Sequence, residues 1–292
     1  MKKIFLLALT MMVFGFSPAQ KKAPDNPFFC FNNSMKMPNA PESFEEQAAL
    51  IDKIGFDGME GHGGEDYHKR RAALDAEGLT MPQIYWSMTL NDDGKVTYDE
   101  EIKEIIKDSK KRDLTVALIV KADQYKQKKD EGDKIVARAI GELADFAAPY
   151  NVKIALYPHV WLYYEKIDHI VKLVNMIDRD NVGAIFNVCH FLKAEGEQHL
   201  KDKLLKVIPH LFLVSINGAD SGNTKEMDWD QLIQPLGDGT FNTYKVVKTL
   251  WDHGYKGPIG VQCYNVDQDC RLALYKTMST WRKYKLKYMQ SR

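Results

Sequence analysis

The sequence alternates between short apolar runs and longer segments of helical periodicity, and the alternation repeats about eight times. The intervening segments, such as 43–54 and 134–148, carry apolar residues on one helical face. Nearly continuous apolar strands between amphipathic helices predict a parallel sheet covered by helices on its outer face. The expected strands are 28–31, 55–59, 80–86, 114–120, 152–156, 182–186, 211–216 and 259–261.

Eight strand–helix repeats predict an α/β protein with a single (β/α)8 barrel, a fold that typically needs about 250 residues. The chain has 292 residues, enough for one such barrel after a short leader. A doubly wound open sheet is the competing architecture, but no G-x-G-x-x-G pattern follows the first strand. No linker or shift in composition divides the chain. We therefore predict a lead at 20–26 and one barrel domain over 27–292.

The first residues have the composition of a secretory signal. Lys2 and Lys3 precede an apolar run over 4–16, and the small residues typical of a cleavage site follow at 17–19. We therefore predict a signal at 1–19 and a periplasmic or secreted mature protein. The run is shorter than the roughly 20 apolar residues of a membrane span, so we expect no stable membrane insertion after cleavage.

The charge balance argues against a nucleic-acid partner. Removal of residues 1–19 takes two of the 40 basic residues and none of the 40 acidic ones, which leaves a net charge of about −2. Proteins that bind nucleic acid need a basic surface to neutralise phosphates. The expected partner is a neutral or weakly charged small molecule instead.

Four cysteines, Cys30, Cys189, Cys263 and Cys270, are too few and too scattered for a disulfide scaffold. Three of them fall in strand-like segments, where small buried residues are common. An oxidising compartment would permit one disulfide, and this alternative stays open. The absence of a C-x-x-C pair disfavours a zinc cluster.

Polar residues follow the apolar runs at 155–159, 186–190, 215–220 and 261–265. In (β/α)8 barrels the catalytic groups come from the carboxyl ends of several strands. The recurrence of polar residues at these positions, one strand–helix unit apart, predicts a site that binds a small molecule and acts on it.

The candidate catalytic groups are His159, His190, Glu60 and Lys121. The two histidines follow neighbouring strands, and Glu60 ends the second strand beside His62 in a glycine-rich turn. Such groups can remove a proton from carbon, return it, or hold an enolate. Each also has a structural alternative: a packed histidine, a solvated turn carboxylate, or a lysine that reaches outward.

Further residues are candidates for substrate binding. His62 forms a second acid/base pair with Glu60, and Trp86, with Tyr85 and Trp161, offers flat faces for a bound ring, although rim packing would explain these aromatics equally well. Asn187, Asn217 and Gln262 are expected to fix hydroxyl groups, and Tyr157 is a further candidate for substrate binding. Asp220 follows in the seventh loop, where a turn-forming aspartate is the alternative.

These motifs together resemble the xylose isomerase-like barrel family, which includes sugar phosphate isomerases and epimerases and proteins related to endonuclease IV. The resemblance covers most of the mature chain. The motifs that carry it are Gly55-Phe56-Asp57-Gly58-Met59-Glu60, Tyr157-Pro158-His159, Asn187-x-x-His190, Ser215-Ile216-Asn217-Gly218-Ala219-Asp220 and Pro235-Leu236-Gly237-Asp238-Gly239.

The resemblance implies that metal ligands would come from strands five to eight as Glu, Asp, His and Glu. The matching positions here are Tyr157, Asn187, Ser215 and Gln262, with Asn217 an alternative for the seventh strand. Neutral amide, hydroxyl and phenol groups compensate poorly for the dehydration of a divalent ion. We therefore predict no cofactor and no inherited metal site.

A rebuilt metal site stays open as an alternative. His62, His159, His190 and Glu60 are suitable ligands for a divalent metal if their side chains converge, and three protein ligands suffice for a catalytic site.

The resemblance and the titratable residues at the strand ends predict an exported enzyme that acts on a sugar or keto-sugar. The expected chemistry is acid/base proton transfer next to a carbonyl: isomerisation, epimerisation, or elimination and hydration. The alternative is a non-catalytic carbohydrate-binding barrel that has lost its metal site, since amides and hydroxyls bind sugars without proton chemistry.

Overall fold

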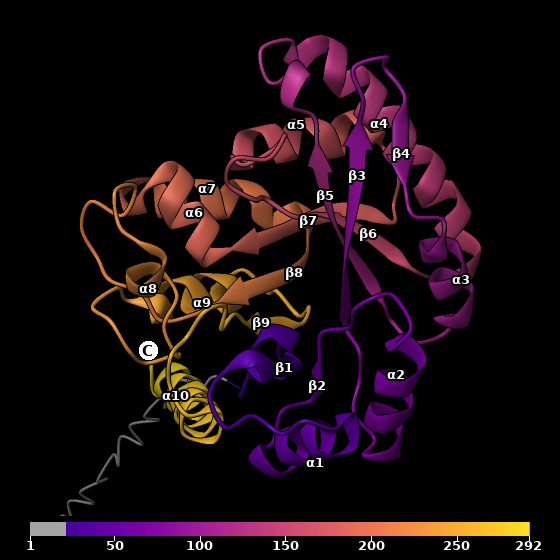
Figure 1. Cartoon of the computed structure of the whole chain (residues 1–292). Coiled ribbons are helices and arrows are strands. Elements are labelled where there is room, and N and C mark those ends of the chain that lie inside the picture. The colour runs from indigo at the N-terminus through magenta and orange to yellow at the C-terminus, as the bar shows by residue number, and fades with distance from the viewer. Residues whose placement is uncertain (1–21, 292) are drawn as a thin grey trace, which may run out of the picture.

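The computed structural model describes residues 22–291, so the predicted signal at 1–19 lies outside the described residues. A nine-stranded sheet has the order β2-β1-β9-β8-β7-β6-β5-β3-β4, and Figure 1 shows helices on the outside of its strands. The predicted barrel of mostly parallel strands is confirmed. The parallel strands are β1 (Phe28–Cys30), β2 (Gly58–Met59), β3 (Gln83–Leu90), β5 (Thr115–Lys121), β6 (Lys153–Leu156), β7 (Val182–Asn187), β8 (Leu211–Ile216) and β9 (Ile259–Val261).

The barrel closes between β2 and β3 through isolated parallel bridges, which pair Gly58 with Thr80 and Gly61 with Ile84. The backbone N–H of Met59 donates to the Thr80 carbonyl oxygen at 3.1 Å. A Cβ on Gly58 would lie 2.2 Å from that oxygen. The close approach of the two backbones at this seam therefore requires glycine.

One strand was not predicted. β4 (Val96–Tyr98) pairs with β3 as an antiparallel hairpin, in a segment that lies outside the eight expected strands. The helix α3 begins only at Glu101, because the Asp99 carboxylate accepts a hydrogen bond from the Glu101 backbone N–H at 3.0 Å and turns the chain.

The helices cover the strands as the apolar periodicity predicted, with two additions. α6 continues directly from β7, and the short α8 lies in the loop after β8. Among the described residues the long helices are α1 (Phe44–Ile54), α2 (Tyr67–Ala76), α3 (Glu101–Asp108), α4 (Lys129–Ala147), α5 (Ile167–Ile177), α6 (Val188–Glu195), α7 (Leu200–Val207), α9 (Thr243–Asp252) and α10 (Cys270–Gln290), with α8 at Trp229–Leu232. None of the helices in 22–291 is both long and apolar enough to cross a membrane.

Two apolar layers result from the alternation of side chains along each strand. A large cluster lies between strands and helices. A second, smaller cluster fills the inside of the barrel with Phe29, Phe31, Ala117, Ile119, Ala155, Tyr157, Ile185 and Leu213. The inner cluster assigns the inward face of β1, β5, β6, β7 and β8, and so identifies which polar side chains on these strands point into the barrel at its carboxyl end.

All four cysteines are buried and free, as was expected for Cys30, Cys189 and Cys263. The disulfide that remained as an alternative is not formed between any of them.

Two glycine variants should affect stability in opposite directions. At Gly260 a Cβ would lie 2.5 Å from ring carbons of both Phe29 and Phe31, so Gly260→Ala should destabilise the fold by about 1–3 kcal/mol through overpacking. Gly141 lies inside α4, where a Cβ would meet only Ile177 at 3.9 Å. Gly141→Ala should stabilise by about 0.5–1 kcal/mol. Urea unfolding midpoints measure both changes, and equal shifts would contradict the packing of the inner layer.

Candidate active site

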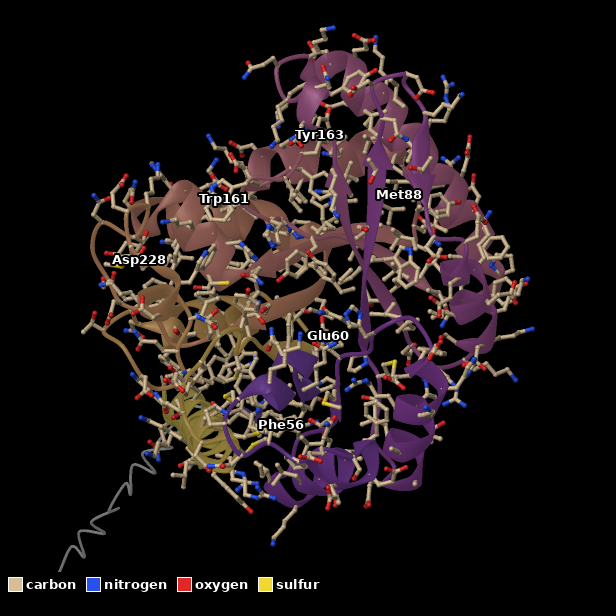
Figure 2. The ribbon with its side chains drawn as sticks, in the orientation of Figure 1. Phe56, Glu60, Met88, Trp161, Tyr163 and Asp228 are labelled. Atoms are coloured by element: carbon tan, nitrogen blue, oxygen red, sulfur yellow. The ribbon has the colours of Figure 1, made fainter. Side chains whose placement is uncertain are left out.

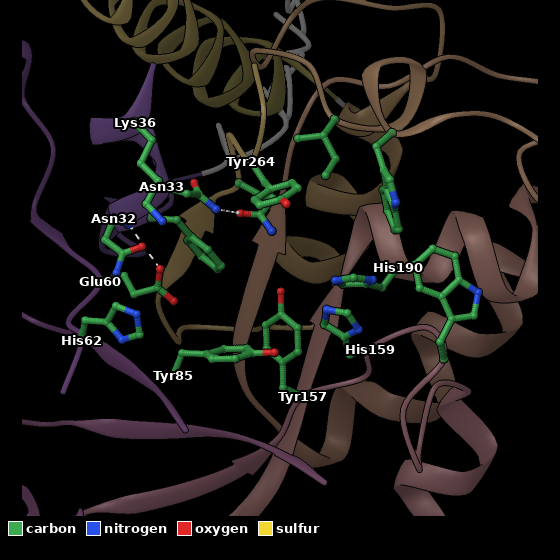
Figure 3. A pocket seen from close by; sticks show the side chains of 15 residues that line it. Asn32, Asn33, Lys36, Glu60, His62, Tyr85, Tyr157, His159, His190 and Tyr264 are labelled. Carbon is green, nitrogen blue, oxygen red and sulfur yellow. Dashed lines mark hydrogen bonds between the residues drawn. The ribbon is translucent and has the colours of Figure 1, made fainter. Parts of the chain in front are cut away.

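A cavity of about 390 Å³ lies at the carboxyl ends of the strands, where the sequence predicted a site. Figure 2 shows Glu60 near the middle of the molecule, and Figure 3 shows the side chains around the cavity. Among the predicted residues, those that line it are Glu60, His62, Tyr85, Tyr157, His159, Trp161, His190 and Gln262.

Glu60 is a buried carboxyl group at the end of β2, only 4% exposed. Its Oε1 accepts a hydrogen bond from Gln83 Nε2 at 2.5 Å, and Oε2 accepts one from the Asn32 backbone N–H at 3.2 Å. Burial raises the pKa of Glu60 from 4.5 to about 7, although both hydrogen bonds oppose this shift. The group therefore exists in both protonation states near neutral pH, as acid/base chemistry requires.

His62 lies on the same side of the cavity as Glu60 (Figure 3). Burial, aided by the positive charges of Arg70 and Lys36, lowers the pKa of His62 below its usual value. This imidazole is therefore neutral at neutral pH.

His159 and His190 lie against each other, with ring centroids 4.0 Å apart. His159 Nδ1 is 2.8 Å from the Val160 carbonyl oxygen, so the nitrogen that carries hydrogen is Nδ1 and Nε2 keeps its lone pair. Burial lowers the pKa of His159 and takes that of His190 well below its usual value. Both are neutral bases, and Figure 3 shows them across the cavity from Glu60.

Tyr157, Asn187 and Gln262 form hydrogen-bonded contacts around the same end of the barrel. Asn187 Nδ2 donates to the Tyr157 hydroxyl at 2.5 Å, and Asn33 Nδ2 donates to Gln262 Oε1 at 2.5 Å. Asn187 is fully buried and caps α6, since its Oδ1 accepts from the His190 N–H at 3.1 Å. Asn187 therefore holds the Tyr157 hydroxyl group without lining the cavity itself. Gln262 does line the cavity.

The remaining predicted residues lie outside this cavity. Asn217 Nδ2 donates to the Gly218 and Leu232 carbonyl oxygens, both at 2.7 Å, and the Asp220 carboxylate accepts from Gln234 Nε2 at 3.2 Å. Both residues hold the loop after β8.

Lys121 and Trp86 line a second cavity of about 470 Å³, which shares His62 and Tyr85 with the first. The offset arises because β3 pairs with β5 as far as Lys121, whereas β6 pairs with β5 only as far as Leu118. Lys121 therefore stands above the level of the main cavity.

Sequence reasoning missed several lining residues. Asn32, Asn33 and Lys36 come from the 3-10 helix η1 (Asn32–Lys36) directly after β1. Two consecutive asparagines directly after the first strand could have indicated cavity-lining residues from the sequence alone. Trp229 and Tyr264 also line the cavity, and Trp229 begins the four-residue helix α8, which the Asp228 capping box starts inside the long loop after β8.

The residues at the family's metal-ligand positions do not fit a divalent ion. Burial holds the pKa of Tyr157 well above its usual range, so its phenol is neutral, and the other three positions carry two amides and the hydroxyl of Ser215. Divalent ions require anionic oxygen or strong nitrogen donors. Within 22–291, no group of three or more His, Cys, Asp or Glu side chains is arranged to hold a metal. The rebuilt set of Glu60, His62, His159 and His190 is divided between opposite walls.

The model of the xylose isomerase-like TIM barrel family matches residues 48–283. The chain therefore belongs to the xylose isomerase-like TIM barrel family. An inosose isomerase of Halalkalibacterium halodurans is 24% identical over 138 residues, which cover 47% of this chain and 48% of that protein. An inosose isomerase of Bacillus velezensis is 28% identical over 179 residues, 56% of this chain and 62% of the relative. The chain thus aligns with about half to three fifths of the length of these relatives.

Solved structures share the fold at low identity. The IolI protein with a bound zinc atom has a TM-score of 0.69 at 17% identity, with 91% of this chain and 100% of that one covered. The 3-keto-D-glucoside 4-epimerase YcjR from E. coli also has a TM-score of 0.69, at 16% identity, with 89% and 100% covered. These matches support the barrel architecture.

The raised pKa of Glu60 predicts a measurable pH dependence of stability. The folded protein keeps a proton that the unfolded chain releases above pH 4.5, so Glu60 destabilises folding progressively between pH 4.5 and about 7. The side chain in Glu60→Gln cannot ionise, so this variant should not lose stability over that pH range. Above pH 7 its free energy of unfolding should exceed that of wild type by up to about 3 kcal/mol, at 1.36 kcal/mol per pKa unit.

Urea unfolding between pH 4.5 and 8 measures the effect. The control is Glu142→Gln, at an exposed carboxyl group on α4, which should follow wild type throughout. Parallel curves for Glu60→Gln and wild type would refute the burial of an ionisable Glu60.

Proposed function

We propose that this chain is an exported enzyme that epimerises or isomerises an uncharged sugar, keto-sugar or cyclic polyol ketone by proton transfer next to the carbonyl group. The observation that carries the proposal is the arrangement of acid/base groups: Glu60, with a pKa of about 7, and the neutral His159 on opposite walls of one cavity. The named activities of the relatives, inosose isomerase and keto-glucoside epimerase, belong to the same class of chemistry.

The arrangement suits epimerisation best. His159 removes a proton from the carbon next to the carbonyl with its Nε2 lone pair, and the resulting enolate is planar. Protonated Glu60 then returns a proton from the opposite face, which inverts the stereocentre. Both groups begin in the correct protonation state near pH 7, because burial shifts their pKa values in opposite directions.

The lining residues favour a neutral ring as substrate. Trp161, Trp229 and Tyr264 offer aromatic faces. Gln262 Oε1 accepts from Asn33, so its Nε2 hydrogens are free to bind a substrate hydroxyl. Lys36 is the one Lys or Arg among the lining residues, which disfavours a phosphorylated sugar. The export proposal rests on the composition of residues 1–19.

Hydrogen exchange into solvent tests the activity directly. The mature protein is incubated with 3-keto-glucosides, inososes and free ketoses in deuterated water, and incorporation next to the carbonyl is followed by NMR. Exchange on one of these classes is expected, with a loss of about 10²–10⁴-fold in Glu60→Gln or in His159→Ala/His190→Ala. Glu60→Gln should also remove the limb of the pH–rate profile near pH 7. Saturable sugar binding without exchange would overturn the proposal and favour the carbohydrate-binding alternative.

A further inference from the structure

The four positions that correspond to metal ligands form one polar layer inside the barrel. Tyr157 and the inner-cluster residue Ala155 share the inward face of their chain segment. Asn187 and Ser215 are two residues beyond the inward Ile185 and Leu213 on β7 and β8, and they pair in register. Gln262 follows the inward Gly260, whose position faces Phe29 and Phe31. The sequence therefore places neutral side chains where a metal would need charged ones.

Within this layer the Tyr157 hydroxyl is held in one hydrogen-bonding role. Asn187 Oδ1 accepts from the His190 backbone N–H at 3.1 Å and from Cys189 Sγ at 3.0 Å. These contacts orient the amide so that Nδ2 faces Tyr157 and donates to its oxygen at 2.5 Å. The phenol oxygen is thus an acceptor in this bond, and its own hydrogen remains available for another acceptor.

The hydrogen of the Tyr157 hydroxyl group is directed toward the cavity. Tyr157 lines the cavity although its side chain is only 2% exposed, and Figure 3 shows its hydroxyl pointing into the space between Glu60 and the two histidines. The ring is fixed from the sides by edge contacts with Tyr85 and His190, at centroid distances of 5.3 and 5.8 Å. A preorganised, desolvated donor of this kind stabilises developing negative charge strongly.

We propose that the Tyr157 hydroxyl, held by Asn187, binds the carbonyl oxygen of the substrate and replaces the divalent ion as the electrophile of this barrel. The inference rests on the proposed function. When His159 takes the proton from carbon, the C–H electron pair forms the carbon–carbon double bond and the carbonyl π pair moves to oxygen. The Tyr157 O–H donates to that oxygen, and the Asn187 N–H stabilises the negative charge that the phenol shares. Return of a proton from Glu60 to carbon restores the carbonyl group and the free phenol.

Infrared difference spectra of a bound 3-keto-glucoside labelled with 13C at the carbonyl test this role separately from turnover. In wild type the carbonyl stretch should shift to lower frequency than in water, and Tyr157→Phe should abolish most of that shift. Exchange in Tyr157→Phe should fall about 10²–10³-fold, the usual cost of one lost donor to an oxyanion. The dissociation constant of the reduced, unreactive polyol should change little.

The matched control is Tyr164→Phe. Tyr164 is an equally buried phenol whose hydroxyl donates to the Leu118 carbonyl oxygen at 2.6 Å, and it is not among the cavity-lining residues. This variant should keep the wild-type shift and exchange rate. If Tyr157→Phe does not fold, difluorotyrosine at position 157, a stronger hydrogen-bond donor, should enlarge the carbonyl shift.

Two outcomes would overturn the inference. One is a carbonyl shift that is absent in wild type or unchanged in Tyr157→Phe. The other is a tightly bound metal, measured by elemental mass spectrometry, whose removal by a chelator abolishes exchange and whose return restores it. A Tyr157-dependent shift without any exchange would instead support the donor and refute the proposed function, so the two failures are distinguishable.

Discussion

The register of parallel strands in a closed sheet is the constraint on which the site depends. Parallel pairing aligns the carboxyl ends of the strands at one end of the barrel, and the pleat sends every second side chain inward. The inner layer of Phe29, Ile185 and Leu213 thereby fixes which residues beyond it face the cavity. A shift of one residue on β7 would exchange the inward Asn187 for Phe186, which now packs in the outer layer. The register of the strands therefore decides which chemical groups face the cavity.

Most of the barrel was predictable because the strands are nearly continuous apolar runs, such as 115–120, between amphipathic helices. The failures have local causes. α6 was missed because Val188-Cys189-His190-Phe191-Leu192 resembles a continued strand, and only the Asn187 side chain, which caps the His190 N–H, begins a helix there. β4 was missed because a three-residue strand has little pattern of its own, and it forms here only by pairing with the long β3.

The ends of the strands determine which candidate residues meet in the cavity, whereas strand length and loop conformation determine which of them do not. Glu60, His159 and His190 follow their strands closely and line the cavity as expected. Lys121 has the expected strand end, but the extra length of the β3–β5 ladder raises it into the neighbouring cavity. The side chain of Asn217 faces the loop that follows it, because its amide group donates hydrogen bonds to two carbonyl oxygens of that loop. Contacts of this kind depend on loop conformation, which the periodicity of the sequence does not encode.

The raised pKa of Glu60 and the neutral polar layer are physically connected. A divalent ion in the cavity would hold nearby carboxyl groups in their charged form and lower their pKa values, since an opposite charge favours ionisation. With a phenol and amides at the ligand positions, burial acts without that opposition and brings Glu60 to about 7. The same burial keeps His159 and His190 neutral. In the proposed mechanism, replacement of the charged ligands therefore changes more than the electrophile: proton transfer falls to Glu60 and His159, whose pKa values burial shifts in opposite directions.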